Sequence, residues 1–161
     1  MKKKRDILFL CQFFYPEYIS SAQLPYDTVL REYEGVISWL RTADVPTFGI
    51  CLGLQLICAA FGVGIRRLPG EGEFGFKPLY RQTAHPLLEG VAEPLHCLEL
   101  HRCEIDHVPE GFSLLLSSDL CRGQMIAHAS RPLFGTQFHP ELTDGYHRDG
   151  IQLLENFLRL Y

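Results

Sequence analysis

The chain has 161 residues, which corresponds to one domain large enough to bury a single hydrophobic core. Hydrophobic residues make up 47% of it and charged residues 21%, an ordinary globular composition that excludes a disordered or fibrous protein. The net charge of −4 argues against a nucleic-acid-binding protein, and no apolar run approaches the roughly 18 residues of a membrane-spanning helix.

The six cysteines stand at irregular spacings, and a chain of this size can fold without disulfides. We therefore expect reduced thiols in a cytoplasmic protein. The basic start, residues 1–5, and the apolar residues after it imitate a signal peptide. Asp6 interrupts that pattern, and Pro16 and Glu17 stand where a small-residue cleavage site would approach, so a buried strand is the preferred interpretation.

The first predicted element is this strand, over residues 7–10, followed by a polar and aromatic stretch. Apolar residues then recur at helical spacing, which predicts an amphipathic helix over residues 28–42. Residues 47–50 are a short apolar run that predicts a buried strand. A helix is expected over residues 54–61, closed by Gly62.

The remainder of the chain is predicted to be rich in strands, which turn residues separate from one another. Strands are expected over residues 77–83, 95–100, 112–117, 125–129 and 133–138. A final helix is predicted over residues 150–161, with its apolar residues on one face. Buried strands combined with amphipathic helices are typical of α/β proteins, so we expect a mostly parallel central sheet.

The clearest chemical signal lies in the tight turn between the second strand and the helix after it. Residues 49–53 read Gly-Ile-Cys-Leu-Gly, the nucleophile-elbow pattern with cysteine in the nucleophile position. Glycines two residues before and after Cys51 fit such a turn, which predicts a positive φ at Cys51. The helix N-terminus favours a thiolate there, and the amide of Leu52 is placed to stabilise an oxyanion. The alternative is a chance turn around a buried structural cysteine.

A second signal follows the last predicted strand, where residues 138–141 read Phe-His-Pro-Glu. A cysteine nucleophile needs an imidazole to accept its proton, and the imidazole needs a carboxylate to hold its tautomer. In an extended segment His139 and Glu141 point the same way, so the carboxylate can reach the ring. The alternative is an ordinary histidine beside an acid.

These two segments resemble the signature motifs of class I glutamine amidotransferases, in the order that the family has them. The resemblance runs from about residue 31 to residue 161 and includes segments 60–62, 71–75, 87–90 and 109–112. It implies a flavodoxin-like α/β fold of the amidotransferase type, with helices flanking the sheet. It also implies that Cys51 is the nucleophile, that His139 is the general base and then the acid, and that Glu141 orients the ring.

The resemblance further implies that Gln55, Gly53 and His101 bind the substrate, which would be glutamine or another γ-glutamyl compound. Hydrolysis would pass through a γ-glutamyl thioester without a cofactor, and ammonia would reach an acceptor on a synthase partner chain. Two alternatives stay open. One is a γ-glutamyl hydrolase or peptidase with the same three residues, and the other is a catalytically impaired remnant that serves as a binding module.

The N-terminal part departs from the family, whose members carry a second strand that ends in a Gly-Gly-Pro-like turn and supplies the other oxyanion donor. Residues 1–30 contain no such turn, so one βα unit is expected to be missing. We therefore divide the chain into an atypical segment, 1–27, and an amidotransferase-like domain, 28–161. Residues 7–27 weakly resemble the opening of a nucleotide-sugar glycosyltransferase. A half-built oxyanion hole predicts weak or undetectable activity, and an open sheet edge predicts a homodimer or larger species.

Several histidines and cysteines crowd into one stretch of the sequence without the spacing of a metal site. They are His96, Cys97, His101, Cys103 and His107. No Cys-x-x-Cys pair is present among them, and neighbouring residues of a strand point to opposite faces. The sequence therefore predicts no metal site.

Overall fold

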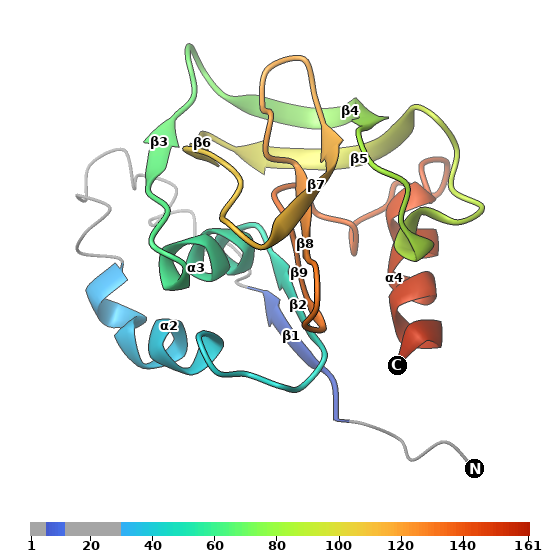
Figure 1. Cartoon of the computed structure of the whole chain (residues 1–161). Coiled ribbons are helices and arrows are strands. Elements are labelled where there is room, and N and C mark those ends of the chain that lie inside the picture. Colours follow the sequence, from blue (N-terminus) through green and yellow to red (C-terminus); the bar gives the residue numbers. More distant parts are fainter. Residues whose placement is uncertain (1–5, 12–29) are drawn as a thin grey trace.

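The computed structural model describes residues 6–11 and 30–161 (Figure 1). The described helices are α2 (Glu34–Leu40), α3 (Leu52–Ala60), α4 (Asp149–Leu160) and the short 3₁₀-helix η2 (Pro86–Leu88). The described strands are β1 (Leu8–Cys11), β2 (Thr47–Ile50), β3 (Ile65–Arg67), β4 (Glu73–Arg81), β5 (Leu95–His101), β6 (Cys103–Ile105), β7 (Phe112–Ser117), β8 (Met125–His128) and β9 (Leu133–Thr136).

Seven of these strands form one sheet in the order β1-β2-β9-β8-β7-β4-β5, and β3 pairs with β6 in a small second sheet. The expected α/β class with flanking helices is confirmed, but the sheet is mixed. The β1–β2 and β2–β9 pairs are parallel, whereas the other four neighbouring pairs are antiparallel. Short turns join β7 to β8 and β8 to β9, and such turns permit only antiparallel pairing, which the sequence analysis did not take into account.

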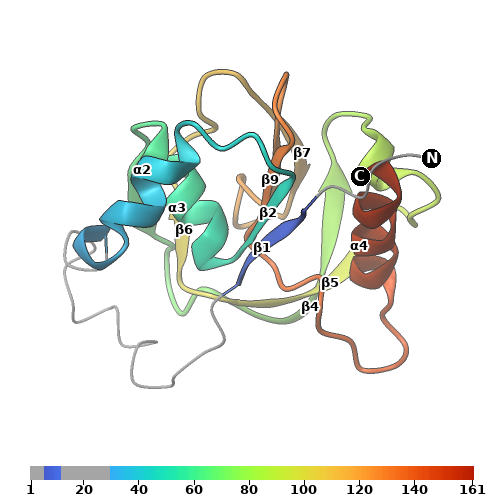
Figure 2. The same cartoon turned by 90° about the horizontal axis from the view of Figure 1, so that it is seen from below.

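Helices cover both faces of the parallel part of the sheet, with α2 and α3 on one face and α4 on the other (Figure 2). Under α4, Phe157 packs edge to face against Phe48 and Phe134, with ring centroids 5.1 and 5.6 Å apart. On the opposite face, residues of α2 and α3 such as Leu40 and Ile57 form a second buried cluster. All of β2 is therefore buried, which explains its continuous apolar sequence.

Several predicted elements have the observed bounds or nearly so. The strands over 47–50 and 112–117 are confirmed, and α4 differs from its prediction by one residue at each end. The helix after the turn begins earlier than expected, at Leu52, and α2 is shorter than the predicted 28–42. As expected, one strand precedes β2 among the described residues, and most of the atypical N-terminal segment lies outside them.

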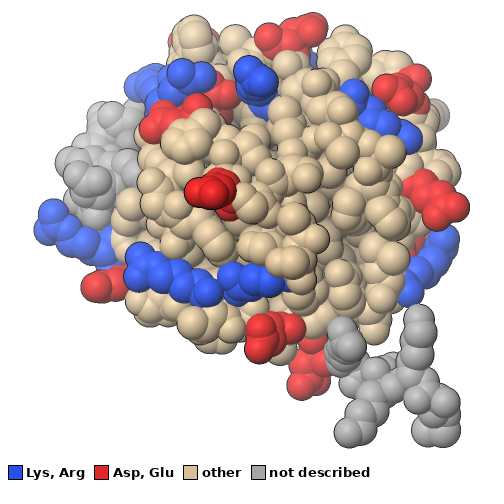
Figure 3. Space-filling view, viewed as in Figure 1, with Lys and Arg blue, Asp and Glu red and all other residues tan. Residues whose placement is uncertain are grey.

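Within residues 6–11 and 30–161, no helix has both the length and the apolar character needed to cross a bilayer. On the face drawn in Figure 3, acidic and basic side chains are interspersed around a central area of other residues. A short row of basic side chains crosses the lower left of that face, with acidic side chains above and below it.

Candidate active site

The turn between β2 and α3 has the predicted strained geometry. Cys51 has φ 54° and ψ −103°, and it is the only non-glycine residue with positive φ among the described residues. Its backbone N–H donates to the carbonyl oxygen of Thr136 at 2.7 Å, which ties the turn to the end of the neighbouring strand β9. Leu52 begins α3, so its backbone N–H is one of the first-turn groups that the helix itself does not use. Strain of this kind is concentrated at functional sites.

Steric contacts explain why glycine stands on both sides of Cys51. A Cβ at Gly49 would lie 2.6 Å from the carbonyl carbon of Gly53 and 2.8 Å from Cδ1 of Ile57. A Cβ at Gly53 would collide with the carbonyl oxygen of Leu10 in β1. The two glycines therefore let the strand, the helix and β1 approach closely enough to form the turn.

The segment after β9 carries the predicted histidine–carboxylate pair. His139 Nδ1 lies 2.7 Å from Glu141 Oε1, and the histidine is 3% exposed. The backbone N–H of His139 donates to the carbonyl oxygen of Leu98 at 2.9 Å, so strand β5 holds the main chain in place. The main chain of His139 is thus held by Leu98 and its ring by Glu141. The carboxylate opposite Nδ1 is the contact that keeps an imidazole in one tautomer.

A buried glutamine connects the two halves of the site, and the sequence analysis missed it. Gln137 Nε2 donates to Cys51 Sγ at 3.6 Å, and Gln137 Oε1 accepts from Gln55 Nε2 at 3.1 Å. Gln137 precedes His139 by two residues, so alternation along an extended segment was the available signal. Because β2 and β9 are neighbouring parallel strands, Cys51 and His139 both follow carboxyl ends at one edge of the sheet.

The other described cysteines have environments that disfavour the thiolate. Burial raises the pKa of Cys58, Cys97 and Cys121 far above the usual thiol range. Burial also raises the pKa of Cys103. Cys51 is partly exposed and stands at the N-terminus of α3, where the helix dipole favours a negative charge.

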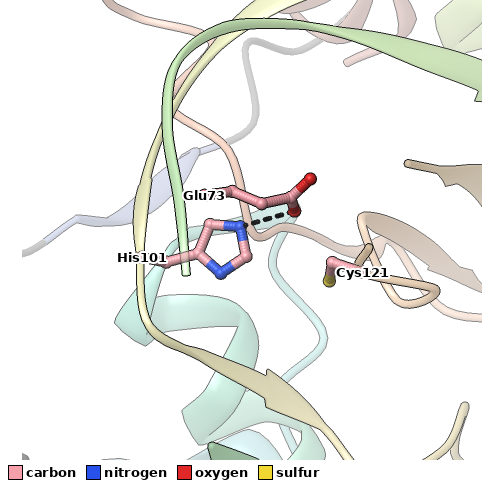
Figure 4. Close-up of side chains that lie close together, drawn as sticks. All are labelled: Glu73, His101 and Cys121. Atoms are coloured by element: carbon pink, nitrogen blue, oxygen red, sulfur yellow. Dashed lines mark ion pairs between the residues drawn. The ribbon is translucent and has the colours of Figure 1, made fainter. Parts of the chain in front are cut away.

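His101, which the resemblance assigned to substrate binding, is buried in a polar cluster (Figure 4). Its Nε2 lies 3.2 Å from Glu73 Oε2 and 2.9 Å from Glu99 Oε2, and its Nδ1 lies 2.9 Å from the carbonyl oxygen of Cys103. Burial alone would lower the pKa of His101, but the two carboxylates more than offset it and raise that pKa to about 9. Both ring nitrogens are therefore engaged inside the protein.

A family model described as "Glutamine amidotransferase class-I" matches residues 11–160. The match begins inside the segment 1–27 that the sequence analysis set apart. A subunit of the glutamine-hydrolyzing GMP synthase of Methanocaldococcus jannaschii is 35% identical over 131 residues, which are 81% of this chain and 68% of that protein. The corresponding protein of Archaeoglobus fulgidus is 35% identical over 125 residues, 76% of this chain and 65% of that protein.

The chain spans about two-thirds of the length of these archaeal relatives. It spans 29% of the glutamine-hydrolyzing GMP synthase of Shewanella woodyi, which is 29% identical over 152 residues and matches 89% of this chain. None of the relatives named here is a glycosyltransferase, so the weak resemblance noted for residues 7–27 gains no support from them.

Solved structures show the same fold. A putative GMP synthase subunit from Thermoplasma acidophilum superposes with a TM-score of 0.78 at 23% identity, covering 96% of this chain and 92% of that one. A glutamine amidotransferase from Thermotoga maritima gives a TM-score of 0.67 at 18% identity, covering 96% and 61%. With a family match over nearly its whole length and an archaeal relative of 35% identity, the chain belongs to the class-I glutamine amidotransferases.

Proposed function

We propose that this chain hydrolyses the side-chain amide of glutamine through a covalent thioester on Cys51. In this proposal His139 acts first as base and then as acid, and Glu141 orients its ring. The observation that carries the proposal is a contact between the two motifs. Cys51, in its strained turn, accepts a hydrogen bond from Gln137, which lies two residues before His139. The 2.7 Å contact between His139 and Glu141 supports the role of the carboxylate.

The first half of the reaction forms the thioester. The Cys51 thiolate attacks the amide carbon of glutamine, and the carbonyl electrons move to the oxygen to give a tetrahedral oxyanion. The backbone N–H of Leu52 donates a hydrogen bond to that oxyanion. The imidazolium of His139 then gives its proton to the leaving nitrogen, the carbon–nitrogen bond breaks, and ammonia departs.

The second half returns the free enzyme. Neutral His139 accepts a proton from water, whose oxygen attacks the thioester carbon. The carbon–sulfur bond breaks, glutamate leaves and the Cys51 thiolate is restored. Glu141 favours the imidazolium in both halves because its carboxylate lies opposite Nδ1.

We assign Gln55 and Gly53 to the binding of the substrate's amino-acid end. Both stand in the first turn of α3, directly after the nucleophile, and Gln55 is held by its hydrogen bond to Gln137. His101 is left out of this assignment because both of its ring nitrogens are engaged in the buried cluster.

The oxyanion hole limits the rate that we expect from the isolated chain. Leu52 supplies one donor, and the sequence of residues 1–30 has no Gly-Gly-Pro turn to supply the second. Loss of one such donor costs on the order of 10²–10³ in rate in other enzymes. The register pairs Cys11 with Ile50, so β1 ends beside the Cys51 turn, and residues 12–29 lie outside the described part.

We further propose that the ammonia is used by a synthase partner chain. The relatives from two archaea are each named as one lettered subunit of a glutamine-hydrolyzing GMP synthase, a name that implies a second subunit. By this analogy, an acceptor site for ammonia lies on the partner and not on the amidotransferase-like chain.

The test is ammonia release from glutamine by the purified chain, with a γ-glutamyl peptide as the alternative substrate. We expect slow turnover of glutamine that disappears in both Cys51→Ala and His139→Ala. Cys58→Ala is the matched control because it removes a buried thiol of α3 and should keep the activity. Ammonia release that survives Cys51→Ala would overturn the proposal. Faster cleavage of the peptide would favour the γ-glutamyl hydrolase instead, and the absence of turnover of either substrate would favour the binding module.

A further inference from the structure

Four buried side chains from separate segments of the chain meet beneath the β7–β8 turn. They are Glu73 of β4, Glu99 and His101 of β5, and Cys121 of the turn. Potential ligand atoms of Glu73, His101 and Cys121 all lie within 4.8 Å of one another (Figure 4). Glu99 joins them through its Oε2 atom, 2.9 Å from His101 Nε2, and it is 0% exposed. We name these four residues the buried quartet.

The hydrogen bonding of His101 leaves its inner nitrogen facing the carboxylates. Nδ1 lies 2.9 Å from the carbonyl oxygen of Cys103, an acceptor, so Nδ1 must carry a proton. With its pKa raised to about 9, the ring is protonated at neutral pH, so an ion bound here replaces the Nε2 proton and takes the lone pair that faces Glu73 and Glu99. A histidine that donates one ring N–H to a backbone carbonyl and aims its other nitrogen at acidic groups has the arrangement of a metal ligand.

The carboxylates of the quartet also call for a positive charge. Glu73 and Glu99 are both buried, and among the described residues neither oxygen of Glu99 accepts a hydrogen bond of good geometry. A buried carboxylate that lacks such partners is costly unless a positive charge, that of an imidazolium or of a metal ion, compensates it.

Outer partners fix one of the carboxylates, as they do in many metal sites. Ser118 Oγ donates to Glu73 Oε1 at 2.7 Å, and Gln124 Nε2 donates to Glu73 Oε2 at 2.8 Å. Together with the contact between His101 and the Cys103 carbonyl oxygen, these bonds hold the two ligands from behind. The cluster thus has both an inner set of donors and an outer set that orients them.

We propose that the buried quartet binds one zinc ion, with a nitrogen from His101, an oxygen from each glutamate and the sulfur of Cys121. Nitrogen, oxygen and thiolate donors in a set of four suit tetrahedral Zn²⁺, and the bound ion displaces the proton that the buried Cys121 thiol otherwise keeps. In such a complex the ligand atoms lie roughly 3.3–3.7 Å apart, given bonds of about 2.0–2.3 Å. The separations of His101 Nε2 from the two glutamate oxygens, 2.9 and 3.2 Å, need small adjustments. Glu99 lies outside the group of three whose ligand atoms are all within 4.8 Å of one another, so its carboxylate must turn toward the other donors when the ion binds.

The surroundings indicate a structural role for this ion. The backbone N–H of Gln137 donates to the carbonyl oxygen of Gln124 at 2.8 Å. The backbone N–H of His139 donates to the carbonyl oxygen of Leu98, the residue before Glu99, at 2.9 Å. An ion held by the quartet therefore stiffens the segments around Gln124 and Leu98, which in turn hold the main chain of Gln137 and His139 in place. Cys121 itself is buried, but its chain neighbours Asp119 and Leu120 are exposed, so the quartet lies close to the surface at the β7–β8 turn.

The sequence analysis predicted no metal site, and the quartet shows why spacing could not find one. Its donors come from residues 73, 99, 101 and 121, with no local motif, and only the pairing of β4 with β5 brings the first three together. Five histidines and cysteines between residues 96 and 107 were considered as metal ligands in the sequence, and only His101 of these five belongs to the quartet.

The test uses the full chain with Cys51→Ala, so that the candidate nucleophile cannot bind the metal. We expect this protein to take up one equivalent of Zn²⁺ and to melt at a higher temperature with it. Co²⁺ in its place should give the visible bands of a tetrahedral complex and a thiolate-to-cobalt charge-transfer band. Added Cys121→Ala should abolish the charge-transfer band and weaken binding at least about tenfold, whereas Cys58→Ala should do neither.

Glu99→Gln provides a second, nearly isosteric variant that tests the site even where Cys121→Ala fails to fold. It should keep the charge-transfer band but weaken Zn²⁺ binding at least about tenfold. The proposal is overturned if the chain binds no stoichiometric Zn²⁺, in which case the quartet is a proton-sharing ion cluster. It is equally overturned if Co²⁺ binds with the same spectrum and affinity after these substitutions.

Discussion

Gly49 offers a test of the turn at Cys51 at the scale of one residue. A Cβ at this position would lie 2.6 Å from the carbonyl carbon of Gly53, a backbone atom that cannot move without opening the turn. We expect Gly49→Ala to destabilise the protein by about 1–3 kcal/mol, the usual cost of overpacking a close contact. Urea unfolding measures this change.

Gly35 is the matched control for that substitution. It lies in α2, and a Cβ there would meet no atom within 4 Å. Gly35→Ala should leave stability unchanged or raise it by about 0.5–1 kcal/mol, because alanine loses less conformational freedom in a helix than glycine does. Equal effects of the two substitutions would show that the turn tolerates a side chain and would remove the steric argument.

The cysteines should differ sharply in reactivity. Burial raises the pKa of Cys58, Cys97 and Cys121, whereas Cys51 is partly exposed at a helix N-terminus. Brief alkylation with limiting iodoacetamide at neutral pH should therefore label Cys51 first, as read by peptide mass spectrometry. Preferential labelling of any of the three buried thiols would contradict the assignment of Cys51 as the nucleophile.

At the scale of single residues, the sequence predicts those parts of the site whose geometry depends on neighbouring residues. The Gly-x-Cys-x-Gly turn and the pair His139–Glu141 were recognisable because their geometry depends on residues within two or three positions. The link through Gln137 and the contact of His101 with Glu73 were not, because both depend on contacts across the sheet. His101 has a local partner in Glu99, two positions before it, but Glu73 lies 28 positions away along the chain.

At the scale of the elements, helix α4 supports the candidate catalytic segment. A Cβ at Gly150, in its first turn, would lie 2.6 Å from Cα of Pro140, which stands between His139 and Glu141. Gly150→Ala should therefore displace this segment and lower kcat for glutamine by roughly 10²-fold, the scale of a 1 Å misplacement. Steady-state kinetics on wild type and variant give the answer.

Glu155→Ala, farther along α4, is the control for the helix as a whole. Its exposed pair with Arg159 contributes little to stability, so this variant should keep wild-type kcat. If Gly150→Ala turns over glutamine at the wild-type rate, the contact of α4 with Pro140 does not position the site.

Element bounds were predictable where burial made the pattern continuous, as in β2, or where the apolar face was regular, as in α4. The three-residue strands β3 and β6 were not predicted, because such short segments carry no periodicity of their own. The apolar pattern alone did not give strand direction. The short turns between β7, β8 and β9 were the sequence signal for antiparallel pairing, and without them the sheet was expected to be mostly parallel.

At the scale of the whole molecule, strand β1 lies at one edge of the seven-stranded sheet, and among the described residues β2 is its only strand neighbour. Unpaired N–H and C=O groups at such an edge attract further strands. We expect the purified chain to form a dimer or larger species, which light scattering coupled to size-exclusion chromatography over a range of concentrations would detect. A monomer at every concentration would contradict this expectation.

The central claim, that Cys51 attacks the side-chain carbonyl of glutamine with help from His139, is tested most directly by a trapped adduct. A diazoketone analogue of glutamine alkylates a nucleophile at its binding site, losing dinitrogen and leaving a stable thioether. Peptide mass spectrometry of the full chain should find the adduct on Cys51, formed much more slowly in His139→Ala and slowed by excess glutamine. An adduct on another cysteine, or one on Cys51 that forms equally fast without His139 or with saturating glutamine, would contradict the account.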